Sequence, residues 1–184
     1  MQSFELRHLY PWSSETVWQA LDSPEYTELR FEHGRRPDAK VTQELLSDQH
    51  EDGVRVRRVR HTLNRSLPRM MQRITGPTLS YLVREQIRPD RYTVEWSAIP
   101  VVARAERAVE RRVRIEGSYR FVDVPGTTRS CERIVKARIT VAIPGFSGRI
   151  ETGIAKSLRA THESSARLAH QFLDARLRPP GSPE

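Results

Sequence analysis

The feature that most constrains the fold is a long helical pattern near the C-terminal end of the sequence. From about Gly148 to Leu177, the positions expected to face inward recur at spacings of three, four or seven residues, as on one side of an α-helix. These positions are Ile150, Ile154, Leu158, Thr161, Leu168, Phe172 and Leu173. A helix of about 28 residues is about 42 Å long, which is more than a small helical bundle needs. We therefore expect a broad apolar surface beneath it.

Most of the chain before this helix alternates between apolar and polar residues, which is the pattern of half-buried strands. We predict seven strands, at residues 4–10, 40–47, 54–63, 79–87, 91–99, 113–121 and 131–143. Two short helices are expected after the first strand, because Ser13 or Ser14 can cap one and Ser23-Pro24-Glu25 can begin another. The predicted fold class is α+β, with the long helix lying on a seven-stranded curved antiparallel sheet.

Two local irregularities are expected within this order. Val54 and Val56 lie in one phase of their strand, whereas Val59, His61 and Leu63 lie in the other. This change predicts a β-bulge near Arg57-Arg58, and residues 48–53 are expected to form the hairpin loop before the strand. Residues 67–74 have helical spacing and predict a short helix inserted between strands.

Composition limits the class of protein but not its activity. The 184 residues favour one domain, which we place at 1–177, followed by a disordered tail at 178–184. The net charge of +8 is consistent with an acidic partner, such as nucleic acid or an anionic membrane surface. Lys40, Lys136 and Lys156 are the only lysines among the 31 basic residues, so the alternative is a solvated, arginine-rich surface.

No cofactor or catalytic motif stands out, and no catalytic residue is assigned. Cys131 is the single cysteine, so an internal disulfide is excluded, and we expect it to be a small packing residue. His162 and His170 lie eight positions apart without a third ligand, which does not predict a metal site. The sequence has no signal-peptide pattern and no run of membrane-spanning length, so a cytoplasmic location is expected.

Two stretches resemble a known superfamily. The first stretch follows the aromatic first strand and reads Pro11-Trp12-Ser13-Ser14-Glu15-Thr16-Val17-Trp18-Gln19-Ala20-Leu21-Asp22-Ser23-Pro24-Glu25-Tyr26. The second stretch, Ile143-Pro144-Gly145-Phe146, leads into the long helix. With the order of elements over residues 2–177, they resemble the helix-grip proteins of the START, Bet v 1 and polyketide cyclase-like (SRPBCC) superfamily, and within it the bacterial DUF2505-type branch.

This resemblance implies a curved sheet that encloses an apolar tunnel together with the C-terminal helix. It also implies binding of lipids, sterols, polyketides or similar molecules, without a shared cofactor. Some members of the superfamily are cyclases or hydratases, so the resemblance alone does not separate a carrier from an enzyme.

The candidate ligand-binding residues fall into two groups. His61, Glu85 and Arg133 are polar residues in the apolar phase of their strands. If they face inward, they must be paired or line a wet cavity, because burying a lone charge costs several kcal/mol; the alternative is that strand twist places them in solvent. Candidate apolar walls are Tyr26, Phe31, Trp96, Tyr119, Ile154 and Leu158.

The segment around Met70 and Met71 is a further candidate. We expect this segment to lie at the mouth of the tunnel, where Arg65, Arg69 and Arg73 would contact anionic lipid headgroups. The alternative is a helix that is packed on the edge of the sheet.

Three functions remain open from the sequence. Binding or transport of a hydrophobic small molecule ranks first, and a cyclase or hydratase that uses His61 or Glu85 ranks second. Nucleic-acid binding ranks third, because the arginine-rich stretch from Gly53 to Gly76 contains no aromatic residue besides His61 for base stacking.

Overall fold

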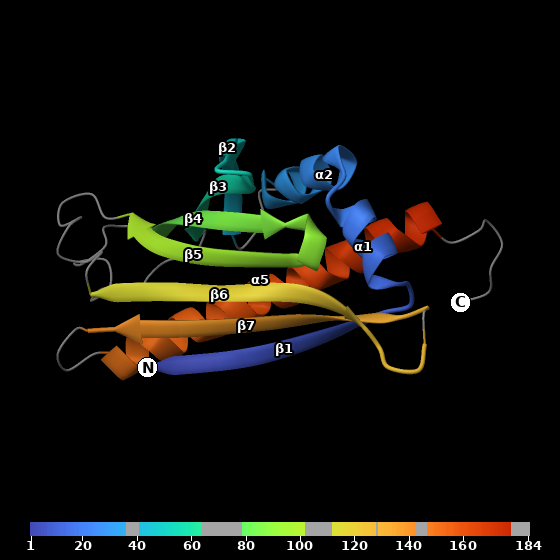
Figure 1. The fold of residues 1–184 in the computed structure, drawn as a ribbon. Helices are drawn as coiled ribbons and strands as arrows, with labels where there is room; N and C mark the ends of the chain where they lie inside the picture. Colours follow the sequence, from blue (N-terminus) through green and yellow to red (C-terminus); the bar gives the residue numbers. More distant parts are fainter. Residues whose placement is uncertain (36–40, 64–78, 102–111, 128, 143–146, 178–184) are drawn as a thin grey trace.

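The computed structural model describes residues 1–35, 41–63, 79–101, 112–127, 129–142 and 147–177. Its main feature is a seven-stranded antiparallel sheet with the strand order β1-β7-β6-β5-β4-β3-β2 (Figure 1). The strands are β1 Gln2–Tyr10, β2 Val41–Glu51, β3 Val54–Leu63, β4 Leu79–Arg88, β5 Thr93–Val101, β6 Val113–Asp123 and β7 Cys131–Val141. The predicted α+β class and the strand number are confirmed.

The long helix α5, Ser147–Leu177, runs along one face of this sheet (Figure 1). It has 31 residues, a length of about 46 Å. Its buried side includes Ile154, Leu168 and Leu173, and it packs mainly on β7 and β1. The helical pattern in the sequence therefore corresponds to one element that spans the sheet.

Two short helices precede β2, as predicted. In α1, Ser14–Leu21, the cap is Ser13, whose Oγ accepts a hydrogen bond from the Thr16 backbone N–H at 3.2 Å. In α2, Pro24–Arg35, the Ser23 Oγ accepts a hydrogen bond from the Tyr26 backbone N–H at 3.3 Å. Farther along the chain, a short 3₁₀ helix, η1 at Pro89–Arg91, links β4 to β5.

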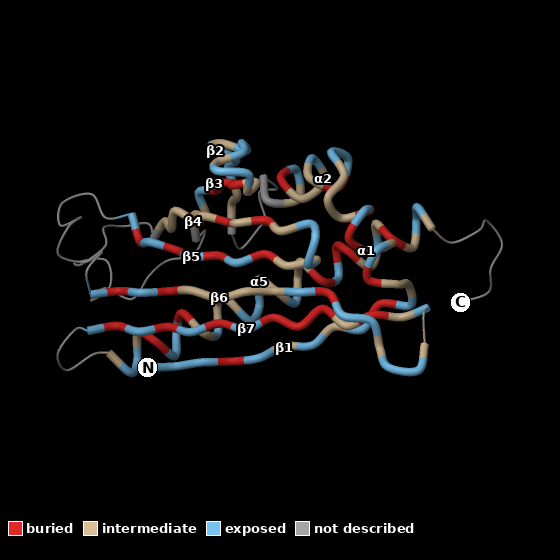
Figure 2. The backbone as a smooth tube through the Cα atoms, viewed as in Figure 1, coloured by how far each residue is buried: buried red, intermediate tan, exposed pale blue. Residues whose placement is uncertain are grey.

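The buried residues form two apolar clusters. One lies around α1 and includes Tyr10, Trp18 and Phe121, and the other lies between the central strands and the N-terminal half of α5. Cys131 is fully buried in the first cluster, and burial raises the pKa of its thiol to about 12, in agreement with a packing role. Figure 2 shows buried segments along β5, β6 and β7, whereas most of the edge strand β1 is exposed.

The predicted position of the β-bulge is wrong. The register between β2 and β3 shifts between Leu45 and Ser47, so Leu46 is the extra residue and lies in β2. The strand β3 pairs with β4 without interruption. The apparent change of phase in β3 has two causes: Val56, which is 1% exposed, is buried in the phase opposite to that of Val59, and the inward position two residues before Val59 is occupied by a buried arginine, Arg57.

The hairpin turn is also tighter than predicted. β2 continues to Glu51, and the chain reverses at Asp52 and Gly53, which have φ values of 50° and 78°. Two consecutive positive φ values match the right-handed twist of the flanking strands. The predicted helix at 67–74 and the predicted tail at 178–184 lie outside the described residues.

Candidate functional site

A cavity of about 140 Å³ lies between the sheet, α2 and α5. Its apolar walls include Ile87 of β4, Trp96 of β5 and Ile115 of β6, with Ile154 and Leu158 of α5 opposite them. Both apolar clusters contribute to the wall, so the cavity lies where the two halves of the core meet.

Most of the residues selected from the sequence surround this cavity. They are Tyr26, His61, Glu85, Trp96, Tyr119, Arg133, Ile154 and Leu158. Phe31 is buried but is not part of the wall, because the next residue along a helix points about 100° away from the face that Tyr26 and Arg30 share. Met70 and Met71 lie outside the described residues.

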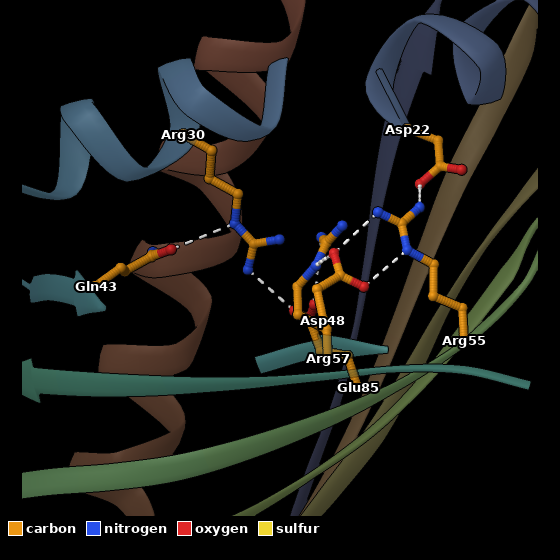
Figure 3. A network of polar contacts seen from close by, with 7 residues as sticks. All are labelled: Asp22, Arg30, Gln43, Asp48, Arg55, Arg57 and Glu85. Carbon is orange, nitrogen blue, oxygen red and sulfur yellow. Dashed lines mark hydrogen bonds and ion pairs between the residues drawn. The ribbon is translucent and has the colours of Figure 1, made fainter. Parts of the chain in front are cut away.

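Glu85 is held by two arginines at the α2 side of the cavity (Figure 3). Its Oε1 accepts a hydrogen bond from Arg30 Nη2 at 2.9 Å, and its Oε2 lies 3.7 Å from Arg57 Nη1, an ion pair too long for a hydrogen bond. Burial by itself raises the pKa of Glu85, but the guanidiniums of Arg30 and Arg57 outweigh it and lower the pKa below its ordinary value. Glu85 is therefore a carboxylate at neutral pH.

The pairing continues from Glu85 toward α1, as Figure 3 shows. Arg57 Nε lies 3.0 Å from Asp48, Asp48 lies 2.8 Å from Arg55 Nε, and Arg55 Nη1 lies 2.6 Å from Asp22. We call the six charged residues Asp22, Arg30, Asp48, Arg55, Arg57 and Glu85 the mouth network. Its three carboxylates balance its three guanidiniums.

Arg133 of β7 stands apart from the mouth network. Its side chain lines the cavity and is 6% exposed, and it forms no ion pair within the described part of the chain. Its guanidinium lies 4.4 Å from the centre of the Tyr119 ring, and its Nη2 lies 3.5 Å from Nδ1 of His162. Its Nε has no hydrogen-bond partner among the described residues.

Two histidines in the wall are neutral at neutral pH. Burial, followed by the charge of Arg30, lowers the pKa of His61 to about 4. Burial and the charge of Arg133 lower the pKa of His162 well below its ordinary value. Since Nδ1 of His162 faces a guanidinium N–H, we place the imidazole proton on Nε2.

Sequence reasoning missed Arg30, Arg57 and His162. Arg30 lies four residues after Tyr26 and so on the same helical face, and Arg57 lies two residues before Val59 in strand phase. From the sequence, His162 is considered only together with His170, as a pair that does not predict a metal site; in the structure His170 stacks on Tyr10, with the ring centroids 4.4 Å apart. Among the described residues, no group of three side chains is arranged to hold a metal ion.

The sequence matches a family model described as a protein of unknown function, DUF2505, over residues 5–173. No curated protein matches the sequence. None of the described helices is both long and apolar enough to cross a membrane.

Several solved structures have a similar fold. The Zhui aromatase/cyclase from Streptomyces sp. R1128 aligns with a TM-score of 0.62 at 13% identity and covers 99% of both chains. A START superfamily protein from Mycobacterium smegmatis has a TM-score of 0.55 at 12% identity, covering 92% of this chain and 98% of its own. Norcoclaurine synthase from Thalictrum flavum has a TM-score of 0.55 at 11% identity, covering 96% and 87%. These identities establish the helix-grip fold alone.

Proposed function

The chain belongs to the DUF2505 family of proteins of unknown function, and we propose that it binds a hydrophobic small molecule in the cavity between α5 and the sheet. The observation that carries the proposal is the wall of this cavity. Apolar side chains from three strands face an apolar stripe of α5, and a few polar groups converge among them. Small-molecule sites in proteins have this composition.

The volume of the cavity sets the size of the ligand. Engineered apolar cavities of about 150 Å³ hold benzene, whereas sites for drug-sized molecules have about 300 to 1,000 Å³. A cavity of about 140 Å³ therefore suits a molecule, or part of one, with a single ring. A lipid-like or polyketide-like ligand requires the walls to move apart.

The polar groups support binding more than acid–base catalysis. A general base works best with a pKa near the working pH, but His61 has a pKa of about 4. Glu85 remains ionised beside two arginines and has no proton to donate at neutral pH. A cyclase or hydratase that uses these two residues is thus the weaker proposal, although two of the similar structures carry enzyme names.

The arginine-rich stretch does not favour nucleic-acid binding, because its described arginines are already paired with carboxylates. Within its described part, Arg58 lies 2.6 Å from Glu51 and Arg60 lies 2.9 Å from Glu44, both on the neighbouring strand β2. These arginines already have carboxylate partners, which compete with phosphate. Arg65, Arg69 and Arg73, on which the idea of a membrane contact depends, lie outside the described residues.

Calorimetric titration of the purified protein with toluene tests the proposal. Toluene is apolar, carries one ring and fits the volume. We expect saturable binding to one site. Titration without saturable heat, at concentrations up to the solubility of toluene, would contradict the proposed function.

A further inference from the structure

We propose that the natural ligand is a small carboxylic acid with an apolar, single-ring body, and that Arg133 binds its carboxylate. This inference rests on the proposed function, because it names the class of molecule that the cavity takes. It follows from the distribution of charge in the wall, from its hydrogen-bond capacity and from the geometry of a guanidinium, and the size of the cavity limits the body of the ligand to about one ring.

The first argument is the distribution of charge. The mouth network is neutral within itself, since each of its carboxylates lies within 3.7 Å of at least one of its arginines. His61 and His162 add no charge at neutral pH. Arg133 is then the one cation in the described wall without a carboxylate. A buried charge without a partner is costly, and a ligand that brings one negative charge removes this cost.

The second argument is the surplus of donors. Three buried N–H groups in the wall have no hydrogen-bond partner among the described residues, namely Arg133 Nε, Arg57 Nη2 and Trp96 Nε1. The other unpartnered buried atoms of the described wall are Glu85 Oε2, which already faces Arg57, and His61 Nε2, which donates or accepts according to the tautomer of the ring, so the donors exceed the acceptors in either case. A wall that offers more donors than acceptors favours a ligand rich in acceptor oxygens.

The third argument separates a carboxylate from a larger anion. A guanidinium matches the planar, two-oxygen geometry of a carboxylate, and such pairs are often bidentate. One uncompensated arginine balances one negative charge, whereas a phosphate ester carries up to two. The Tyr119 ring lies 4.4 Å from this guanidinium, so the charged end of the site adjoins an apolar surface that suits a ring.

The test compares benzoate with benzamide by calorimetry. The two molecules have nearly the same size, but only benzoate is charged at neutral pH. We expect unmodified protein to bind benzoate roughly 10- to 100-fold more tightly than benzamide, the range for a hydrogen bond to a charged group. Arg133→Met should abolish this preference, while Arg133→Lys should retain part of it.

The matched control is Arg138→Met. Arg138 lies on the same strand, β7, but is exposed on the opposite face. The substitution changes the net charge by the same amount, so loss of the preference in Arg138→Met would mean that benzoate binds by surface charge, and would overturn the inference. Near-UV circular dichroism establishes that each variant is folded.

The remaining outcomes separate the two proposals. If toluene binds but benzoate binds no more tightly than benzamide, the assignment of a carboxylic acid is wrong and the hydrophobic site stands. If none of the three molecules binds, both proposals are wrong. If Arg133→Met does not fold, the comparison of benzoate with benzamide on the unmodified protein and on Arg133→Lys still decides the matter.

Discussion

Arg30 of α2 donates a hydrogen bond to Glu85 of β4 at 2.9 Å, and both side chains are largely shielded from solvent, with exposed fractions of 17% and 6%. The two residues are 55 positions apart in the sequence. Their pairing joins α2 to the inner strand β4 at the α2 side of the cavity, so the same contact stabilises the fold and shapes the candidate site.

Glu85→Gln tests the contribution of this contact to stability. The variant leaves Arg30 and Arg57 without the charge of their shared partner, and breaking a buried ion pair from one side costs about 3 to 5 kcal/mol. We expect the free energy of unfolding, measured in urea, to fall by about 3 kcal/mol. The control is Glu116→Gln, which removes an ion pair with an arginine that is 78% exposed and should cost less than about 1 kcal/mol. Equal effects of the two substitutions would show that Glu85 is not buried in an ion pair.

Acidification should destabilise the protein before its carboxylates titrate. The pKa of His61 is about 4 in the fold against 6.5 in the unfolded chain. Between these pH values the unfolded chain binds more protons, so the stability due to neutral His61 is complete above about pH 6.5 and is lost as pH falls toward 4. His162 and His8, whose pKa values are also lowered chiefly by burial, act in the same direction.

Urea unfolding at a series of pH values measures this dependence. His61→Asn should reduce the slope of stability against pH in this range, whereas His50→Asn, at an exposed position of β2, should leave it as in the wild type. A slope that is the same in His61→Asn and in the wild type would contradict the assignment of His61 as a buried neutral histidine.

Gly117→Ala should distort the cavity wall at Trp96, whose ring packs against this glycine. A Cβ atom at Gly117 of β6 would collide with the backbone oxygen of Lys136 and lie 2.5 Å from the Trp96 ring, which lines the cavity. Overpacking of this kind costs about 1 to 3 kcal/mol, and we expect altered tryptophan fluorescence as well. Gly153→Ala is the control, because this position in α5 has no heavy atom within 4 Å; alanine there should stabilise the helix by about 0.5 to 1 kcal/mol. Wild-type stability of Gly117→Ala would indicate that β6 and Trp96 are packed less closely than described.

Ser157→Leu should fill the cavity. Ser157 belongs to the part of α5 that lines it, and a leucine side chain occupies much of a space the size of one ring. We expect this variant to fold and to lose toluene binding in calorimetry. Lys156→Leu introduces the same side chain at the exposed neighbouring position and should bind toluene as the wild type does. Equal binding by both variants would place the toluene site elsewhere.

The order of elements and part of the site were predictable because local pattern determines them. Period-two alternation located the strands, and the stripe of apolar residues located α5. His61, Glu85 and Arg133 were recognisable because each is a polar residue in an apolar strand phase. The structure places all three in the wall of the cavity rather than in solvent.

The remaining features depend on contacts between segments that are distant in sequence. Arg30 could not be assigned to Glu85, because nothing local to α2 indicates which strand it faces. The arginine-rich stretch from Gly53 to Gly76 contains no acidic residue; Glu44, Asp48 and Glu51, which pair with its described arginines, belong to β2 and become neighbours only once the strands pair. The bulge was assigned to the wrong strand since a break in phase does not distinguish an extra residue from a buried arginine.

The most direct test of the account is a titration with toluene followed by methyl NMR of protein labelled at isoleucine. Ile87, Ile115 and Ile154 line the cavity, whereas Ile99 is 44% exposed and lies outside it. If toluene binds in the cavity, the methyl signals of the three cavity isoleucines shift together to saturation and that of Ile99 does not move. Shifts confined to Ile99, or no saturable shift of the three cavity signals, would contradict a hydrophobic ligand site between α5 and the sheet.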